Sequence, residues 1–177
     1  NPVQPTRITM MQLYTKTQIK PFIQRISHDS SILSLGSCFA DNMAKRLNSL
    51  KFDVVSSPTG ILFNPESIAL AIERFAAYNN GDSNALPQRN ELHYDNGCWF
   101  HYDFHSAFSN SDPDKALAQM QEAVKLGAEA LQRADTVIIT FGSAIIYRYN
   151  DNRQVVANCH KQPQRLFTRE LLDAEAI

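Results

Sequence analysis

The spacing of apolar and polar residues predicts short strands alternating with amphipathic helices. Residues 31–35, Ser-Ile-Leu-Ser-Leu, have the pattern of a strand that ends at Gly36. Apolar residues then recur at helical spacing, at Phe39, Met43, Leu47 and Leu50. Residues 52–55 have the composition of the next strand. Strand, helix and strand of this length predict a βαβ unit with parallel strands and a right-handed crossover.

Two dipeptides that end in proline predict the starts of later helices. Asn64-Pro65 and Asp112-Pro113 each place a capping side chain before a proline in the first helical turn. The apolar run at residues 136–140 predicts a strand buried on both faces of a parallel sheet.

Two β-hairpins and a last helix are predicted in the remaining segments. Residues 92–102 form an aromatic hairpin candidate with Asn96-Gly97 at its turn. A second hairpin is predicted over residues 145–156, and a helix near Thr168. One or both hairpins are expected to be insertions in an α/β domain.

The predicted sheet has exposed edges, because only three parallel strands are joined by two crossovers. We therefore expect residues 11–177 to form the N-terminal part of one α/β domain that is incomplete at its C-terminus. Residues 1–10 are expected to be an upstream or vector-derived tail, with Met10-Met11 marking the natural start.

Charge and composition exclude several classes of partner. The net charge of −1 provides no basic field for a nucleic acid. No stretch approaches the roughly 20 apolar residues that cross a bilayer, and the N-terminus lacks the apolar core of a signal peptide. The cysteines Cys38, Cys98 and Cys159 are odd in number and suit a reducing compartment. We expect no nucleic-acid or membrane partner and a cytoplasmic location.

Three loops are expected to meet at the carboxyl end of the sheet, where open α/β sheets bind ligands. They contain residues 36–38, 58–60 and 141–143. Ser37 lies between a strand and a helix N-terminus, where Gly36 permits a tight turn. Free N–H groups of the first helical turn can stabilise an oxyanion, so Ser37 is a candidate nucleophile for an acyl carbonyl. A simple N-cap serine is the alternative.

Several separate motifs carry a family resemblance that spans nearly everything from Met11 onward. They are Gly36-Ser37-Cys38-Phe39-Ala40, Gly60-Ile61-Leu62-Phe63-Asn64-Pro65, Phe104-His105-Ser106, Thr140-Phe141-Gly142-Ser143-Ala144 and Asn158-Cys159-His160-Lys161. On these residues the chain resembles the GSCFA domain family, which is similar to the SGNH (GDSL-like) hydrolases. The resemblance implies a flavodoxin-like three-layer α/β/α sandwich that hydrolyses or transfers ester-linked acyl groups. No cofactor is expected.

The resemblance assigns roles to individual residues. Ser37 corresponds to the nucleophile, and Gly60 to a glycine whose N–H binds the oxyanion together with the N–H of Ser37 or Cys38. The third motif usually supplies an asparagine, but here it reads Gly142-Ser143, so Ser143 or Asn158 is expected to donate instead.

The proton acceptor is the least defined part of the expected site. The Asp-x-x-His motif that usually holds the base is absent from the sequence. Either it lies beyond Ile177, or His160 or His105 serves as the base. Each histidine could instead bind substrate or hold a loop.

Three competing interpretations concern other side chains. Cys38 would be reactive at a helix N-terminus, but we favour a small buried filler. The histidines and cysteines lack the spacing of usual zinc motifs, so no metal site is predicted. The aromatic residues of the first hairpin could stack on a sugar, but we favour a hairpin core. They are Tyr94, Trp99, Phe100, Tyr102, Phe104 and Phe108.

The leading functional prediction is a serine esterase that acts on a small or carbohydrate-linked ester through Ser37. The alternatives are a non-catalytic ligand-binding domain and an O-acyltransferase of the same fold. The substrate and the oligomeric state stay open at this point. The esterase prediction requires that the hydroxyl of Ser37 project into solvent, flanked by unpaired backbone amides.

Overall fold

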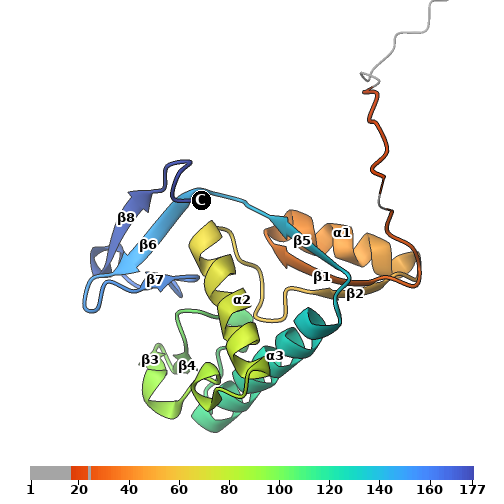
Figure 1. The fold of residues 1–177 in the computed structure, drawn as a ribbon. Helices are drawn as coiled ribbons and strands as arrows, with labels where there is room; N and C mark the ends of the chain where they lie inside the picture. The colour runs from red at the N-terminus through yellow and green to blue at the C-terminus, as the bar shows by residue number, and fades with distance from the viewer. Residues whose placement is uncertain (1–16, 24) are drawn as a thin grey trace, which may run out of the picture.

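The centre of the fold is a three-stranded parallel sheet with the order β2-β1-β5 (Figure 1). The computed structural model describes residues 17–23 and 25–177. The strands are β1 (Ser31–Gly36), β2 (Asp53–Ser56) and β5 (Thr136–Thr140). The predicted parallel βαβ unit is confirmed, because β1 pairs with β2 in parallel and a helix connects them.

Helices pack on both faces of this sheet. Helix α1 (Cys38–Ser49) places Ala44 against Ile32 of β1 and Val54 of β2. Helices α2 (Pro65–Asn79) and α3 (Pro113–Arg133) pack on each other and join the core cluster that contains Leu33 and Leu35. Neighbouring residues of β1 therefore contact opposite layers, as the alternation of a strand requires.

The two predicted helix starts are confirmed by their capping contacts. The Asn64 side chain accepts a hydrogen bond from the Ser67 N–H at 2.8 Å. The Asp112 carboxylate accepts from the N–H groups of Asp114 at 2.9 Å and Lys115 at 3.3 Å. Each cap satisfies donors that the first turn leaves free.

The aromatic hairpin is confirmed as β3 (His93–Asp95) and β4 (Cys98–Phe100). Its turn residues Asn96 (φ 48°) and Gly97 (φ 81°) are both left-handed, as the two-residue hairpin requires. Tyr102, which follows the hairpin, is buried with Phe100 in an aromatic core, so the core interpretation is confirmed for these residues. The short 3₁₀ helices are η1 (Ser83–Ala85), η2 (Arg89–Glu91), η3 (Ser106–Phe108) and η4 (Gln164–Leu166).

A third sheet has the order β7-β6-β8 and contains a strand that was not expected. Strands β6 (Ile145–Tyr149) and β7 (Val155–Val156) confirm the second hairpin. The helix predicted near Thr168 is wrong, because β8 (Phe167–Leu171) occupies this segment and pairs antiparallel with β6. The buried Phe167 anchors β8 to the aromatic core, a long-range contact that overrides local preference.

Burial departs from the sequence pattern at two elements. In α1, Leu47 packs against the core, but Phe39 is 62% exposed and the helix buries Ala40 and Ala44. Strand β5 is not buried on both faces: Val137 is 40% exposed and Ile139 is 43% exposed. Strand β5 is at the edge of the sheet, and α3 packs on β1 rather than over β5.

The α/β class and the parallel sheet are confirmed, and the flavodoxin-like three-layer sandwich stays a prediction. The tail predicted at residues 1–10 lies outside the described residues. Within the described part of the chain, no helix is both long enough and apolar enough to cross a membrane.

Candidate functional site

Ser37 follows directly on a close approach of β1 to β5 at Gly36. Gly36 has a φ of +129°, and a Cβ at this position would overlap the carbonyl oxygen of Thr140. Only glycine fits this approach without strain. The Ser37 N–H donates to the Thr140 carbonyl at 3.1 Å, and the two hydroxyl oxygens are 3.1 Å apart. Thr140 is therefore the direct partner of Ser37, although sequence reasoning did not single it out.

The hydroxyl of Ser37 does not cap helix α1. Ser37 occupies the N-cap position, but its side chain makes no capping hydrogen bond and contacts Thr140 instead. Within residues 17–23 and 25–177, no group accepts a hydrogen bond from the N–H of Cys38 or Phe39. The capping interpretation is therefore wrong, and the positive end of α1 is open beside Ser37.

The predicted projection of the Ser37 hydroxyl into solvent is also wrong, because Ser37 is only 6% exposed. Thr140 covers it from β5, and Gly142 approaches so closely that a Cβ there would lie 3.1 Å from the Ser37 Cβ. A substrate that reaches this oxygen must therefore enter a largely water-free position.

Cys38 is exposed, so its interpretation as a buried filler is wrong. It is the first residue of α1, where the sheet-facing positions belong to Ala40 and Ala44. The thiol therefore lies next to Ser37 on the accessible side of the helix start.

The second loop approaches the site through Leu62 rather than through Gly60. The Leu62 N–H donates to the Gly36 carbonyl at 2.9 Å. The Gly60 N–H, which the resemblance assigns to the oxyanion, donates to the Ser57 carbonyl at 2.8 Å in a turn. Gly60 has a φ of +93°, and a Cβ there would overlap the Cβ of His105. Gly60 thus permits the close packing of His105.

The third loop is held by one carbonyl group. The oxygen of Phe63 accepts hydrogen bonds from the N–H groups of Gly142 at 2.8 Å and Ser143 at 2.9 Å. Together with the contacts of Leu62 and Thr140, these bonds join the loops at residues 36–38 and 141–143 to residues 62–63 at the carboxyl end of the sheet. The segment that meets the two loops therefore lies just beyond the predicted loop at residues 58–60.

His160 and His105 have opposite tautomers. The His160 Nε2 lies 3.0 Å from the carbonyl oxygen of His101, which can only accept, so Nε2 carries the proton and Nδ1 keeps its lone pair. The His105 Nδ1 accepts from the Ala107 N–H at 3.2 Å, so the proton of its neutral ring is on Nε2. Burial lowers the pKa of His160. In the described part of the chain, neither ring hydrogen-bonds to Ser37.

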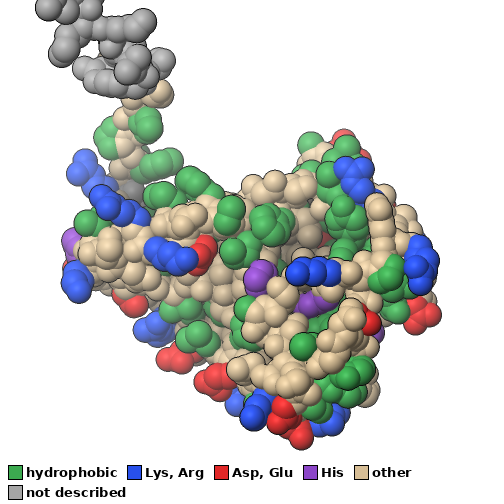
Figure 2. Space-filling model, turned by 180° about the vertical axis from the view of Figure 1, so that it is seen from behind, with side chains coloured by type: hydrophobic (Ala, Val, Ile, Leu, Met, Phe, Trp, Pro, Cys, Tyr) green, Lys and Arg blue, Asp and Glu red, His purple; other side chains and the backbone are tan. Residues whose placement is uncertain are grey.

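A hollow of about 370 Å³ brings several predicted site residues together. Phe63, His105, Ser143 and Asn158 line it. Figure 2 shows this face of the molecule hollowed at its centre, beneath the part that carries β6 and β8, with histidine side chains at the hollow. Ser37 does not line the hollow but contacts its wall through Gly142.

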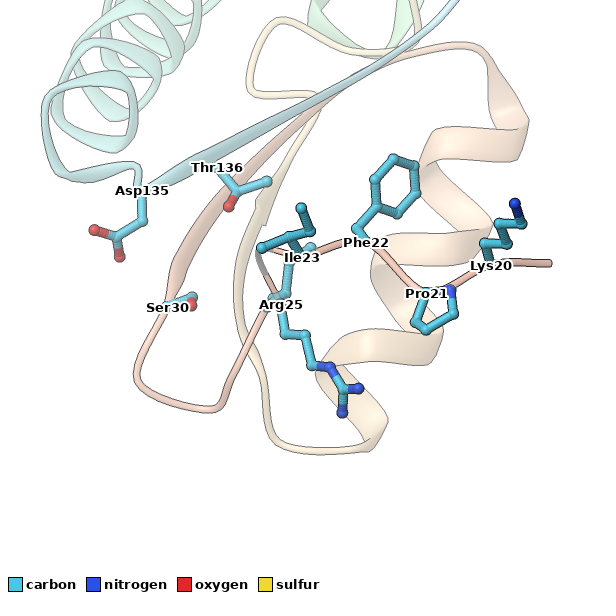
Figure 3. Close-up of a pocket in the computed structure, with 9 residues that line it drawn as sticks. Lys20, Pro21, Phe22, Ile23, Arg25, Ser30, Asp135 and Thr136 are labelled. Atoms are coloured by element: carbon cyan, nitrogen blue, oxygen red, sulfur yellow. The ribbon is translucent and has the colours of Figure 1, made fainter.

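A larger cavity of about 730 Å³ lies at the opposite end of the sheet. It is lined by residues 20–23 and 25–26 and by the starts of β1 and β5, at Ser30 and Thr136, and Figure 3 shows these segments around it. Asp135 lines this cavity, but its carboxylate already accepts a hydrogen bond from the backbone N–H of Ser31 at 2.9 Å. We place the site at the carboxyl end instead, because the grouped polar side chains lie there.

A buried polar cluster next to the hairpin was missed by sequence reasoning. Arg74 pairs with Asp103 at 2.7 Å, and both side chains are largely buried. Burial and the charge of Arg74 lower the pKa of His101 to about 4. Among the described residues, no group of three or more His, Cys, Asp or Glu could hold a metal ion. Through these contacts Arg74 of α2 is joined to His101 and Asp103 in the segment that follows β4.

Comparison with known proteins identifies one family. The model of the GSCFA family matches residues 31–177, which includes every element from β1 to β8. No curated protein and no solved structure matches the chain.

Proposed function

This chain belongs to the GSCFA family, and from that premise we propose that it cleaves ester-linked acyl groups at the carboxyl end of its sheet. The Ser37 hydroxyl does not have the solvent exposure that the sequence-based prediction required, so the proposal requires an ester to reach it past Thr140 and Gly142. The observation that carries the proposal is instead the uncapped start of α1. Ser37 occupies the cap position, yet its hydroxyl leaves the N–H groups of Cys38 and Phe39 free. Free N–H groups beside a hydroxyl are what acyl transfer needs at an oxyanion. An SGNH-like three-layer fold is part of this proposal.

In the proposed reaction the Ser37 oxygen forms a bond to the acyl carbonyl carbon, and the ester C–O bond breaks. The carbonyl oxygen becomes negative and is held by the N–H groups of Cys38 and Phe39. The Ser37 proton passes through a base to the leaving alcohol. Water then releases the acyl group from Ser37 by the same route, so atoms and charge balance.

We assign the base role to His160 rather than to His105. Its Nδ1 lone pair is free, and the bond from Nε2 to the His101 carbonyl fixes this tautomer. The neutral ring of His105 can only donate from Nε2. The His160 ring stacks on Phe100 with 4.3 Å between the ring centroids. To reach Ser37 it must leave this position and break its bond to the His101 carbonyl, so the base role requires the loop with positive φ at His160 (49°) and Lys161 (58°) to rearrange.

Activity-based labelling tests the nucleophile. A fluorophosphonate probe and a p-nitrophenyl ester are offered to the wild type, Ser37→Ala and Cys38→Ala. We expect Ser37→Ala to abolish labelling and to lower the turnover rate at least 100-fold, because no other residue of the site can replace the nucleophile. Cys38→Ala should keep both. Loss in Cys38→Ala with retention in Ser37→Ala would instead identify the exposed thiol as the nucleophile.

A second candidate function is ligand binding without catalysis. The observation that favours it is the hydrogen bond of the Ser37 hydroxyl to Thr140, which is not a base. This function predicts no fluorophosphonate labelling and no ester turnover in the wild type.

The low exposure of Ser37 also suits acyl transfer to an alcohol, because water has limited access to this position. An O-acyltransferase would form the acylated product only when an acceptor sugar is present. Product analysis with and without the sugar separates transfer from hydrolysis.

A further inference from the structure

A small cavity lies where α2 meets the loop before it and the segment after β4. Four polar residues line it, and the rest of its wall is apolar. The polar residues are Thr59, Ser67, Arg74 and Asp103. The cavity volume is about 10 Å³, and a volume of roughly 10–15 Å³ holds one water molecule. The cavity is therefore too small for any organic ligand but has the size of a single water.

Two hydroxyl groups of this lining lack a partner in the protein. Among the described residues, nothing forms a hydrogen bond with Oγ1 of Thr59 or with Oγ of Ser67, and both oxygens are fully buried. Thr59 is only 2% exposed and Ser67 only 4%. Buried polar groups are paired either with protein groups or with an ordered water. These two hydroxyls therefore require a partner from outside the chain.

The ion pair at the cavity supplies hydrogen-bonding groups of both kinds. Arg74 Nη2 donates to Asp103 Oδ2 at 2.7 Å, with the two side chains 14% and 6% exposed. Burial raises the pKa of Asp103, and the charge of Arg74 only partly opposes this shift. A guanidinium only donates, a carboxylate only accepts, and a hydroxyl does both. Such a lining suits a water molecule, which donates and accepts and typically forms about three hydrogen bonds when buried.

We infer that Thr59, Ser67 and the Arg74–Asp103 pair bind one structural water molecule. A cation does not fit this lining, because its one carboxylate is already paired with Arg74. The water joins α2 to the loop before it and to the segment after β4. The Thr59 carbonyl also accepts from the His105 N–H at 3.1 Å. The water therefore helps to hold the segment that carries His105 into the wall of the larger hollow.

Oxygen-17 relaxation dispersion of the solvent tests the inference, because it counts the waters that a protein holds longer than its tumbling time and does not detect hydroxyl protons. Thr59→Val keeps the shape of the side chain without its hydroxyl and should lose one long-lived water. Ala71→Val removes no hydroxyl, but its added methyl groups fill the cavity that Ala71 lines, so it should lose the same water. Thr168→Val is the matched control. Its hydroxyl has a protein partner, Asn150 Oδ1 at 2.7 Å, and the count should not change.

Urea unfolding gives a second readout that differs in sign. Thr59→Val should lower the midpoint, because the hydrogen bonds made through the water are lost. Replacing a hydroxyl that had no partner at all would raise it. A raised midpoint, an unchanged water count in Thr59→Val or Ala71→Val, or an equal loss in Thr168→Val would each overturn the inference. If Thr59→Val does not fold, the count in Ala71→Val decides.

Discussion

Replacing Gly36 by alanine tests a close approach in the candidate site. The backbone at residue 36 has a φ of +129°, which a residue with a Cβ rarely adopts, and the added Cβ would overlap the Thr140 carbonyl oxygen. The same carbonyl accepts from the Ser37 N–H, so it cannot move away without breaking that bond. Gly36→Ala should therefore destabilise the fold and displace Ser37 at once.

The magnitude follows from two separate costs. A strained φ costs about 1–3 kcal/mol, and steric overlap in a packed region costs about 1–3 kcal/mol more. We expect the free energy of unfolding to fall by roughly 2–6 kcal/mol, the sum of these costs. Gly81→Ala separates them, because Gly81 also has a positive φ (+85°) but nothing lies within 4 Å of its added Cβ. This control should lose only about 1 kcal/mol.

Urea unfolding followed by circular dichroism measures both variants, with the midpoint compared at an unchanged slope. If the slope does change, the compactness of one state has changed and the comparison is repeated by thermal unfolding. Equal losses in Gly36→Ala and Gly81→Ala would refute the close contact between β1 and Thr140. The geometry assigned to Ser37 would fail with it.

Three further predictions concern the rest of the fold. Burial lowers the pKa of His101 to about 4. As the pH falls, His101 therefore becomes protonated in the unfolded chain at a higher pH than in the folded chain. The stability present above pH ~6.5 should therefore be lost on acidification, by about 2 kcal/mol between pH 7 and pH 5. His101→Asn, which keeps an acceptor for the Asp103 N–H, should flatten this part of the profile of unfolding free energy; an unaltered profile would contradict the assignment. Gly127→Ala should cost about 1–3 kcal/mol in urea unfolding because its Cβ would overlap the Phe75 ring, and Phe75→Leu should recover part of that loss. A purely additive double variant would show that the two residues do not interact. Arg74→Met should cost about 3–5 kcal/mol by leaving Asp103 buried without its partner. A loss below about 1 kcal/mol, typical of an exposed pair, would show that the pair is not buried.

The sequence alone predicted the helix starts and the turn that depend on residues within a single turn of the chain. Asn64-Pro65 and Asp112-Pro113 determine two helix starts, because the capping side chain and the fixed proline φ act within one turn. Asn96-Gly97 determines the hairpin turn in the same way. The Gly-Ser junction after β1, and the meeting of its loop with the loop after β5, follow from the order of strands and helices.

Contacts between residues far apart in the sequence decided which side chains are buried, which strands pair and where the histidine protons lie. Thr140 is 103 residues from Ser37 along the chain, yet it buries the hydroxyl and removes it from the helix cap. The pairing of β8 with β6 overrides the helix predicted near Thr168. The proton positions on His105 and His160 depend on the backbone groups that the fold places beside each ring. Burial, tautomer and strand partner are properties of the packed chain, so no local pattern of residues could specify them.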